Sequence, residues 1–268
     1  MQDPGMSDAT AGDPATPGAL VRLDVVGGVA TITLDSPANR NALSAALRAQ
    51  LRAALDAAAG DDAARVVVLT HRGRVFCAGM DLKEEAVAEP GRQGVRELPA
   101  ILQRIARCPK PVLARVAGPA RAGGLGIMAA ADIVVTVPSA TFAFSEVRIG
   151  LIPAVITVPV LHRVQPTAAR ELLLTGEVFG AARAREIGLV NAVEENIDGA
   201  VDRYTAALLA GGPTALAGTK ALLQRGLDDS DERYAALLRV SAAQFASDEA
   251  REGAVSFTRK RAPSWVAG

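Results

Sequence analysis

The sequence predicts an α/β fold with a mostly parallel sheet, followed by a helical C-terminal region. Short apolar runs at 65–70, 111–116 and 132–137 have the length and composition of buried strands. Stretches with helical spacing of apolar residues separate them, which is the alternation expected of βα repeats. Beyond residue 166 candidate helices follow one another to the end of the chain.

The first elements of this fold are a hairpin and a helix. Alternating apolar residues between 21 and 34 flank Gly27-Gly28, which is typical of two antiparallel strands joined by a tight turn. Leucines then recur every four residues, so 45–59 is predicted to be a helix that ends at Gly60. A second helix is expected at 95–106.

The C-terminal part of the chain is predicted to be helical. Its expected helices are 168–175, 181–187, 197–210, 215–227, 232–246 and 249–258. The chain therefore divides into a flexible tail (1–18), an α/β core (19–200) and a helical region (201–268).

Composition excludes several classes of protein. Half of the 268 residues are hydrophobic, and 29 basic residues balance 29 acidic ones. A disordered chain is poorer in apolar residues, and a general nucleic-acid binder carries net positive charge. No apolar run approaches the roughly 20 residues that span a bilayer, and no signal peptide is recognisable. We therefore expect neither a nucleic-acid nor a membrane partner.

The two cysteines and two histidines show no metal-ligand spacing, so no metal site is predicted. Two cysteines do not suggest a disulfide scaffold, and free thiols suit a reducing compartment. The expected location is therefore cytoplasmic.

Two glycine-containing turns are candidates for a functional site. Residues 75–82 follow the strand at 65–70, and the glycine-rich stretch 118–126 follows the strand at 111–116 and opens a helix. Glycine permits close approach of a ligand to the backbone, and a helix N-terminus presents free N–H groups. Together the turns can supply two donors for one oxyanion, although each alone also fits an ordinary strand–helix turn.

Four segments, 37–43, 76–82, 117–132 and 144–153, resemble the enoyl-CoA hydratase/isomerase (crotonase) superfamily in this order. The resemblance extends from about residue 20 to the C-terminus. It implies a crotonase-like ββα spiral core that carries an acyl-CoA site. It also implies a C-terminal trimerisation region, and hence a homotrimer or a dimer of trimers.

The resemblance assigns roles to individual residues. The backbone N–H groups of Met80 and Gly123 match the oxyanion hole that polarises a thioester carbonyl, and Glu146 matches an acid/base. The expected substrate-binding residues are Ala78, Asp81, Leu82, Gly124, Gly126 and Lys260. No cofactor is expected, since coenzyme A is part of the substrate and the thioester is the only electron sink required.

One position departs from the family's pattern. The family's hydratases usually carry two glutamates; Glu146 matches the second, but Gly126 stands where the first is expected. A single carboxylate can hydrate a double bond by relaying one proton, or can move a proton between two carbons. Reversible hydration of a 2-enoyl-CoA is the favoured interpretation. The alternatives are an enoyl-CoA double-bond isomerase and a catalytically silent acyl-CoA-binding protein.

Four side chains have competing interpretations. Glu146 is either solvated or lies in an apolar pocket that raises its pKa. Asp81 is a helix cap rather than a second acid/base, and Arg121 is an exposed loop arginine rather than a ligand for CoA phosphate or a substrate carboxylate. Lys260 either reaches the CoA phosphates of an adjacent subunit or belongs to a solvated charge run.

Overall fold

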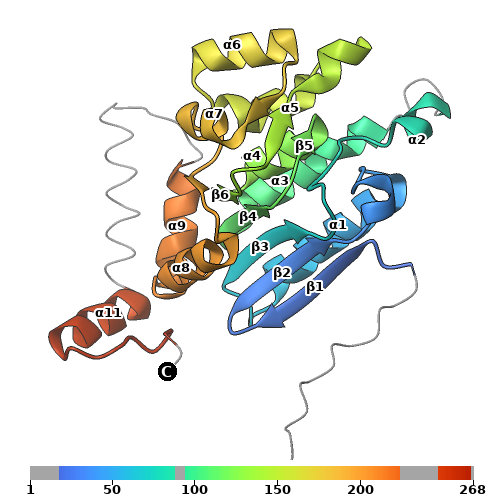
Figure 1. The fold of residues 1–268 in the computed structure, drawn as a ribbon. Coiled ribbons are helices and arrows are strands. Elements are labelled where there is room, and N and C mark those ends of the chain that lie inside the picture. Colours follow the sequence, from blue (N-terminus) through green and yellow to red (C-terminus); the bar gives the residue numbers. More distant parts are fainter. Residues whose placement is uncertain (1–17, 88–93, 224–246, 267–268) are drawn as a thin grey trace, which may run out of the picture.

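The computed structural model describes residues 18–87, 94–223 and 247–266 (Figure 1). Its main sheet has the strand order β1-β2-β3-β4-β6-β9, and a second sheet has the order β5-β7-β8. The strands of the main sheet are β1 (Val21–Val26), β2 (Val29–Leu34), β3 (Val66–His71), β4 (Val112–Val116), β6 (Ile133–Thr136) and β9 (Ala192–Val193). Those of the second are β5 (Ala120–Arg121), β7 (Thr141–Ala143) and β8 (Phe179–Gly180).

The described helices surround and extend these sheets. The α-helices are α1 (Ala45–Gly60), α2 (Leu82–Val87), α3 (Leu98–Arg107), α4 (Gly123–Ala130), α5 (Ala154–Leu161), α6 (Pro166–Thr175), α7 (Ala181–Glu186), α8 (Ile197–Leu209), α9 (Pro213–Leu223) and α11 (Asp248–Thr258). Three 3₁₀ turns accompany them: η1 (Pro37–Asn39), η2 (Gly94–Glu97) and η3 (Ser145–Ile149). The α/β fold with a mostly parallel sheet is confirmed, since only β1 and β2 pair antiparallel in the main sheet.

The predicted hairpin and first helix are confirmed. Gly27 and Gly28 both adopt positive φ (57° and 82°), as a two-residue hairpin turn of the favoured hand requires. Helix α1 starts where the side chain of Ser44 accepts a hydrogen bond from the N–H of Leu47 (3.3 Å), and its leucines are buried. The hairpin and α1 therefore form as their local sequence dictates.

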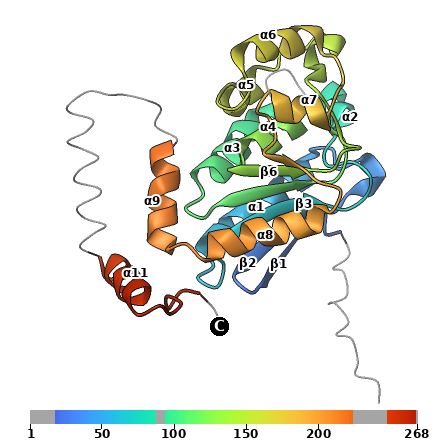
Figure 2. The ribbon, with the colours of Figure 1, turned by 60° about the vertical axis from the view of Figure 1, so that its left-hand side comes forward.

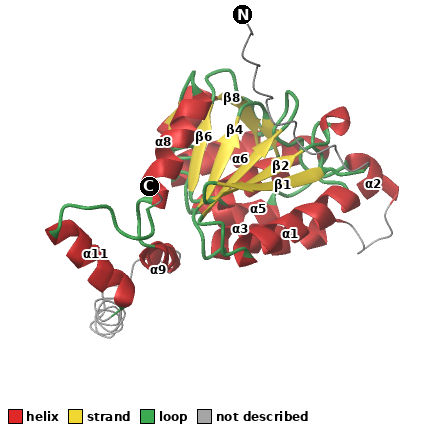
Figure 3. Cartoon of the chain, turned by 90° about the horizontal axis from the view of Figure 1, so that it is seen from below, coloured by secondary structure: helices red, strands yellow, loops and turns green. Residues whose placement is uncertain are grey.

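Strand β3 forms the centre of the core. All six of its residues are buried, because the helical layer of α1 and α3 covers one face of the sheet and α8 packs on the other. Figure 3 shows α1 and α3 together on one side, and Figure 2 shows α8 lying along the sheet. A strand that is covered on both faces has a continuous apolar sequence, and this pattern predicted β3.

Helix α5 was not predicted. Its sequence, residues 154–161, contains no charged residue and includes Pro159, so it shows neither amphipathic spacing nor an uninterrupted helical pattern. It packs against α4, which is buried along its whole length. The two apolar helices therefore share a packed interface.

The C-terminal helices attach to the far side of the core, away from α2 (Figures 1 and 2). The guanidinium of Arg65, at the start of β3, donates to the carbonyls of Gly211 (2.6 Å) and Trp265. The carboxylate of Glu249 in α11 accepts from the first N–H groups of α9. The predicted boundary at residue 200 falls inside α8, which packs on the main sheet.

Some predicted features fall outside the described residues. These are the tail up to residue 17, the helix predicted at 232–246 and the end of the helix predicted at 215–227. Within the described ranges, no single helix has the length and apolarity to cross a membrane. Helices Ile197–Ala210 and Pro213–Leu223 have that length and apolarity only when taken as a pair, and the pair is bent by 107°. No group of three potential metal ligands occurs in the same ranges.

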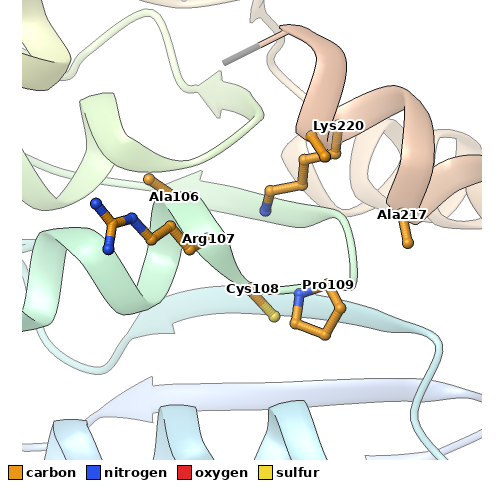
Figure 4. Close-up of a pocket in the computed structure, with 7 residues that line it drawn as sticks. Ala106, Arg107, Cys108, Pro109, Ala217 and Lys220 are labelled. Carbon is orange, nitrogen blue, oxygen red and sulfur yellow. The ribbon is translucent and has the colours of Figure 1, made fainter. Parts of the chain in front are cut away.

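Lys220 connects α9 to the core. Its ammonium lies 2.7 Å from a carboxylate oxygen of Asp132 and donates to the carbonyls of Ile105 and Lys110. It also lines a cavity of about 440 Å³ between α9 and the end of α3, and Figure 4 shows its side chain reaching across towards the core. Since Lys220 is buried, its charge depends on these partners for stabilisation.

We predict that Lys220→Met lowers the free energy of unfolding by about 2 kcal/mol, because it removes the charge-assisted hydrogen bonds from the buried ammonium to the carboxylate of Asp132 and to two carbonyls. Denaturation in urea measures the change. Lys83→Met, at an exposed lysine, is the control and is expected to change stability by less than about 0.5 kcal/mol. Equal stability of the two variants would contradict the role of Lys220.

Candidate active site

The candidate site lies at the carboxyl ends of β3 and β4. These strands are parallel neighbours, ending at His71 and Val116, so the segments that follow them leave the sheet at the same edge. In open α/β sheets, ligands bind outside the carboxyl ends of the strands. The two glycine-containing turns identified in the sequence are therefore brought together.

Backbone hydrogen bonds hold the first turn on both sides. On one side, the N–H of Phe76 donates to the carbonyl of Pro119 (2.9 Å), and the N–H of Arg121 donates to the carbonyl of Cys77 (3.0 Å). On the other side, Ala78 donates to Arg40 (3.1 Å), and Leu43 donates to the carbonyl of Gly79 (2.8 Å). Residues 77–79 thus form the middle of a small three-segment layer.

The turns approach each other as closely as backbone atoms permit. A Cβ on Gly124 would lie 2.7 Å from the carbonyl oxygen of Cys77, and one on Gly118 would lie 2.3 Å from that of Arg74. Both contacts are far inside van der Waals range, so only glycine fits at these positions. The packing of the two turns depends on these missing side chains.

The structure places Gly79, the residue before Met80, next to Gly123. A Cβ on Gly79 would lie 3.5 Å from the backbone nitrogen of Gly123, and Gly79 has a φ of +90°. Gly123 is the first residue of α4, so its N–H has no partner within the helix. Among the described residues, neither this N–H nor that of Met80 has a hydrogen-bond acceptor. Two free donors at adjacent positions have the chemistry of an oxyanion hole.

The residue before Gly123 is conformationally strained. Ala122 adopts φ 47° and ψ −120°, a region that L-residues rarely enter and that costs on the order of 1–3 kcal/mol. Its N–H donates to the carbonyl of Ala143 (3.1 Å), and its carbonyl accepts from Leu125 (2.9 Å). The neighbouring elements therefore hold the start of α4 in an orientation that the local sequence does not favour.

Glu146 is a buried carboxylate on η3. Its residue exposure is 9%, and its Oε2 atom has no hydrogen-bond partner among the described residues. Burial raises the pKa of Glu146, and a hydrogen bond with its own backbone offsets part of that rise. Glu146 is thus buried rather than solvated, and the carboxyl is suited to accept and return a proton.

Apolar side chains occupy the space beside Gly126. A Cβ there would lie 2.5 Å from Cγ2 of Ile156 and 3.6 Å from Cδ2 of Leu102. Ile156 belongs to α5 and is 2% exposed. The volume that a glutamate at position 126 would need is filled, so in this chain Glu146 has no second carboxylate beside it on α4.

The remaining predicted substrate-binding residues lie in different settings. Oδ1 of Asp81 accepts from the N–H of Lys83 (3.1 Å), so Asp81 caps α2, as expected. Leu82, the first residue of α2, is exposed, and Ala78 is half-buried. Lys260 is exposed and lies just beyond α11. Arg65 holds this C-terminal region at the amino end of β3, whereas the candidate site lies at the carboxyl end of the same strand.

The expectation for Arg121 is wrong. It is half-buried rather than an exposed loop residue, and its guanidinium donates to the carbonyl (2.6 Å) and hydroxyl (2.9 Å) of Thr141. Burial lowers the pKa of Arg121. The side chain joins β5 to β7, which explains an arginine in this turn without any ligand.

Two positioning side chains were not identified from the sequence. The buried amide of Asn41 accepts from the N–H of Ser36 (2.7 Å) and donates to the carbonyls of Arg72 (3.0 Å) and Val75 (2.8 Å). Nε2 of His71 accepts from the N–H of Ala117 (3.1 Å), so it carries no proton. Burial lowers the pKa of His71. These contacts tie together the segments that carry the two free N–H groups.

The fold is that of the crotonase class. Residues 24–267 match the profile of the family Enoyl-CoA hydratase/isomerase. The chain belongs to this family.

Similar proteins support the same assignment. EchA19 of Mycobacterium tuberculosis, named an enoyl-CoA hydratase, is 34% identical over 87% of this chain and 91% of its own length. A crystal structure of enoyl-CoA hydratase from Mycobacterium smegmatis has a TM-score of 0.86 and 36% identity, covering 93% of this chain and 100% of its own. AtuE of Pseudomonas aeruginosa has a TM-score of 0.87 and 31% identity over 93% of this chain and 100% of its own.

We predict that Glu146→Gln raises the free energy of unfolding at pH 7 by about 1 kcal/mol, because it removes a buried charge. The pKa of Glu146 is raised in the folded state, so the contribution of Glu146 to wild-type stability becomes more favourable as pH falls through that pKa towards about 4.5, the pKa in the unfolded chain. The difference between the two proteins should therefore shrink with acidification. Denaturation midpoints at pH 7 and pH 5 test this, and a variant less stable than the wild type at pH 7 would contradict it.

We also predict that His71 makes the fold sensitive to mild acid. Its folded pKa is lowered, so below about pH 6.5 the unfolded chain takes up a proton that the native protein does not, and stability falls by up to about 1.4 kcal/mol per pH unit. His71→Gln should remove this loss between pH 7.5 and 5.5, whereas His162→Gln, at the exposed histidine, should retain it. Identical pH dependence of the two variants would refute the assignment.

Proposed function

We propose that the protein is an enoyl-CoA hydratase that reversibly adds water to a 2-enoyl-CoA thioester. The observation that carries this proposal is the free N–H pair of Met80 and Gly123. Two such donors stabilise the negative charge that develops on a thioester oxygen when an enolate forms, and loss of one donor typically costs about 3 kcal/mol. The names of the relatives favour hydration as the reaction.

In this proposal Glu146 performs both proton transfers. Its carboxylate accepts a proton from water while the water oxygen bonds to C3 of the enoyl group. The electron pair of the double bond moves to C2, and the enolate forms with its oxygen at the two N–H groups. Glu146 then returns the proton to C2, which gives the 3-hydroxyacyl-CoA. The raised pKa of Glu146 brings its proton affinity closer to that required for this relay at neutral pH.

A specific observation favours a second candidate, isomerisation of a 3-enoyl-CoA. Ile156 and Leu102 fill the volume beside Gly126, so no second carboxylate there can orient a water molecule. A lone carboxylate suffices to remove a proton from C2, which gives a dienolate whose oxygen lies at the same two N–H groups, and to return the proton to C4 as the double bond forms between C2 and C3. Both reactions use the same three residues and need no metal or redox group.

The assembly and setting of the enzyme are part of the proposal. The protein acts as a cytoplasmic homotrimer or dimer of trimers, in which Lys260 of one subunit serves the CoA phosphates at a neighbouring site. The acyl-CoA contacts proposed nearer the reacting carbons come from residues 78–82 and from Gly124 and Gly126.

Direct assays distinguish the candidates. Hydration of crotonyl-CoA removes the absorbance of the conjugated enoyl thioester, whereas isomerisation of a 3-enoyl-CoA creates it. We expect loss of absorbance with crotonyl-CoA. A gain of absorbance with the 3-enoyl-CoA, and no change with crotonyl-CoA, would identify the protein as an isomerase. Binding of acyl-CoA without a change of absorbance for either substrate would identify it as a catalytically silent binding protein.

We predict that Glu146→Gln lowers kcat by about 10³-fold with little change in KM, since the amide cannot take up the proton. Glu177→Gln, at an exposed glutamate, is the matched control and should retain wild-type turnover. Full activity of Glu146→Gln would remove Glu146 from the mechanism.

A further inference from the structure

We propose that Arg48 is a positioning residue for the oxyanion hole, and that it fixes the direction of the Met80 N–H by holding the backbone of Leu43. This inference rests on the proposed function, because it concerns one of the two N–H groups that the proposal assigns to the thioester oxygen. Arg48 is the fourth residue of α1, and no pattern in the sequence indicated a role for it.

Leu43 adjoins both proposed donors. Its N–H donates to the carbonyl of Gly79 (2.8 Å), and Leu43 and Met80 form an isolated parallel bridge. Its side chain meets the second donor, since a Cβ on Gly123 would lie 3.2 Å from Cδ1 of Leu43. Leu43 is fully buried, so these contacts are shielded from water.

The hydrogen bond from Leu43 sets the direction of the Met80 N–H. The carbonyl of Gly79 and the N–H of Met80 belong to one planar peptide group, and in a trans peptide these two bonds point in opposite directions. Every described peptide bond is trans. Because Leu43 holds the carbonyl, the N–H is directed away from the Leu43 backbone. A hydrogen bond to the carbonyl also polarises the peptide group and strengthens its N–H as a donor.

The guanidinium of Arg48 holds Leu43 at its other polar group. Nη1 of Arg48 donates to the carbonyl of Leu43 (2.6 Å), which precedes the N-cap of α1 and therefore lies outside the hydrogen bonds of the helix. Side chains of a helix lean towards its N-terminus, which is why Arg48 reaches a carbonyl five residues earlier. Leu43 is thus fixed between Arg48 and Gly79.

The charge of Arg48 is buried among carboxylates of two other elements. Arg48 is 3% exposed, and its guanidinium lies 3.2 Å from Glu97 and 3.9 Å from Glu84. A buried ion pair gains little net stability, because desolvation offsets the attraction. The carboxylate of Glu84 also accepts from the N–H of Ala45 (2.7 Å), so the chain that follows Met80 is tied to the start of α1 as well. The placement of Arg48 therefore serves the geometry of this segment.

The test compares Arg48→Met with Arg52→Met. Arg52 lies one turn further along α1 and also pairs with Glu97 (2.7 Å). Both variants therefore remove an ion pair with Glu97, whereas only Arg48→Met releases the carbonyl of Leu43. With crotonyl-CoA, kcat of Arg48→Met should fall about tenfold with KM changed by less than about twofold. Arg52→Met should match the wild type.

A spectroscopic readout separates positioning from a general effect on packing. The absorbance of hexadienoyl-CoA, a conjugated thioester, moves to longer wavelength when its carbonyl is polarised, and its spectrum is recorded immediately after mixing with protein. Arg48→Met should lose most of the shift seen with the wild type, and Arg52→Met should retain it.

A second variant covers the case in which Arg48→Met does not fold. Arg48→Lys keeps the positive charge, but its single nitrogen cannot occupy the positions at Leu43 and Glu97 together, so it should lose about half of the shift.

Two outcomes would overturn the proposal. One is a wild-type shift that every folded Arg48 variant retains in full. The other is the absence of a shift with the wild type, which would refute the proposed oxyanion hole as well. A wild-type shift without conversion of either enoyl-CoA would refute the proposed reaction alone, and loss of that shift in the Arg48 variants would still support the positioning role.

Discussion

The candidate site depends on backbone-to-backbone packing between the turn after β3 and the turn that opens α4. Gly124 lies so close to the carbonyl of Cys77 that a Cβ would come within 2.7 Å of it. This contact aligns the segment ending at Met80 with the N-terminus of α4. Because the proposed donors are main-chain N–H groups, their geometry is set by how closely these segments approach.

Side chains outside the reacting centre maintain this geometry. Asn41 holds the segment around residues 72–75, and His71 joins the end of β3 to Ala117. Both side chains are buried, and each satisfies backbone groups that no regular strand or helix would satisfy. The strained backbone of Ala122 is held by other contacts, among them the hydrogen bond from its N–H to the carbonyl of Ala143. A site built from main-chain donors thus requires polar side chains as supports rather than as reactants.

The sequence predicted those parts of the fold that local physics determines. The hairpin, α1, β3 and β4 lie within one or two residues of their predicted bounds, because glycine turns and apolar spacing act over short distances. Strands of two or three residues, such as β5 and β8, carry too little pattern to recognise. Helix α5 was not predicted because an apolar stretch interrupted by proline has no amphipathic period.

The same distinction holds for the site. The glycines were recognised as turns, and the family resemblance selected Glu146, but the contacts that position them join residues far apart in sequence. His71 meets Ala117 across 46 positions, and Asn41 meets Val75 across 34. Arg121 was misjudged for this reason, since its partner Thr141 lies on another strand. Such pairings follow from the folded topology, which no local pattern encodes.

The glycine at position 126 leaves Glu146 without a second carboxylate on α4, and this affects how tightly Glu146 binds its proton. Ile156 and Leu102 fill the volume beside Gly126, and Glu146 is buried with an oxygen that no described residue satisfies. A second carboxylate close by would repel the first when both are ionised, whereas burial raises the cost of ionising Glu146 by desolvation alone. Glu146 therefore binds its proton more tightly than a solvated glutamate without sharing that proton with a partner. An isolated carboxyl of this kind is suited to moving a single proton from one atom of the substrate to another, which is the step that hydration by relay and isomerisation have in common.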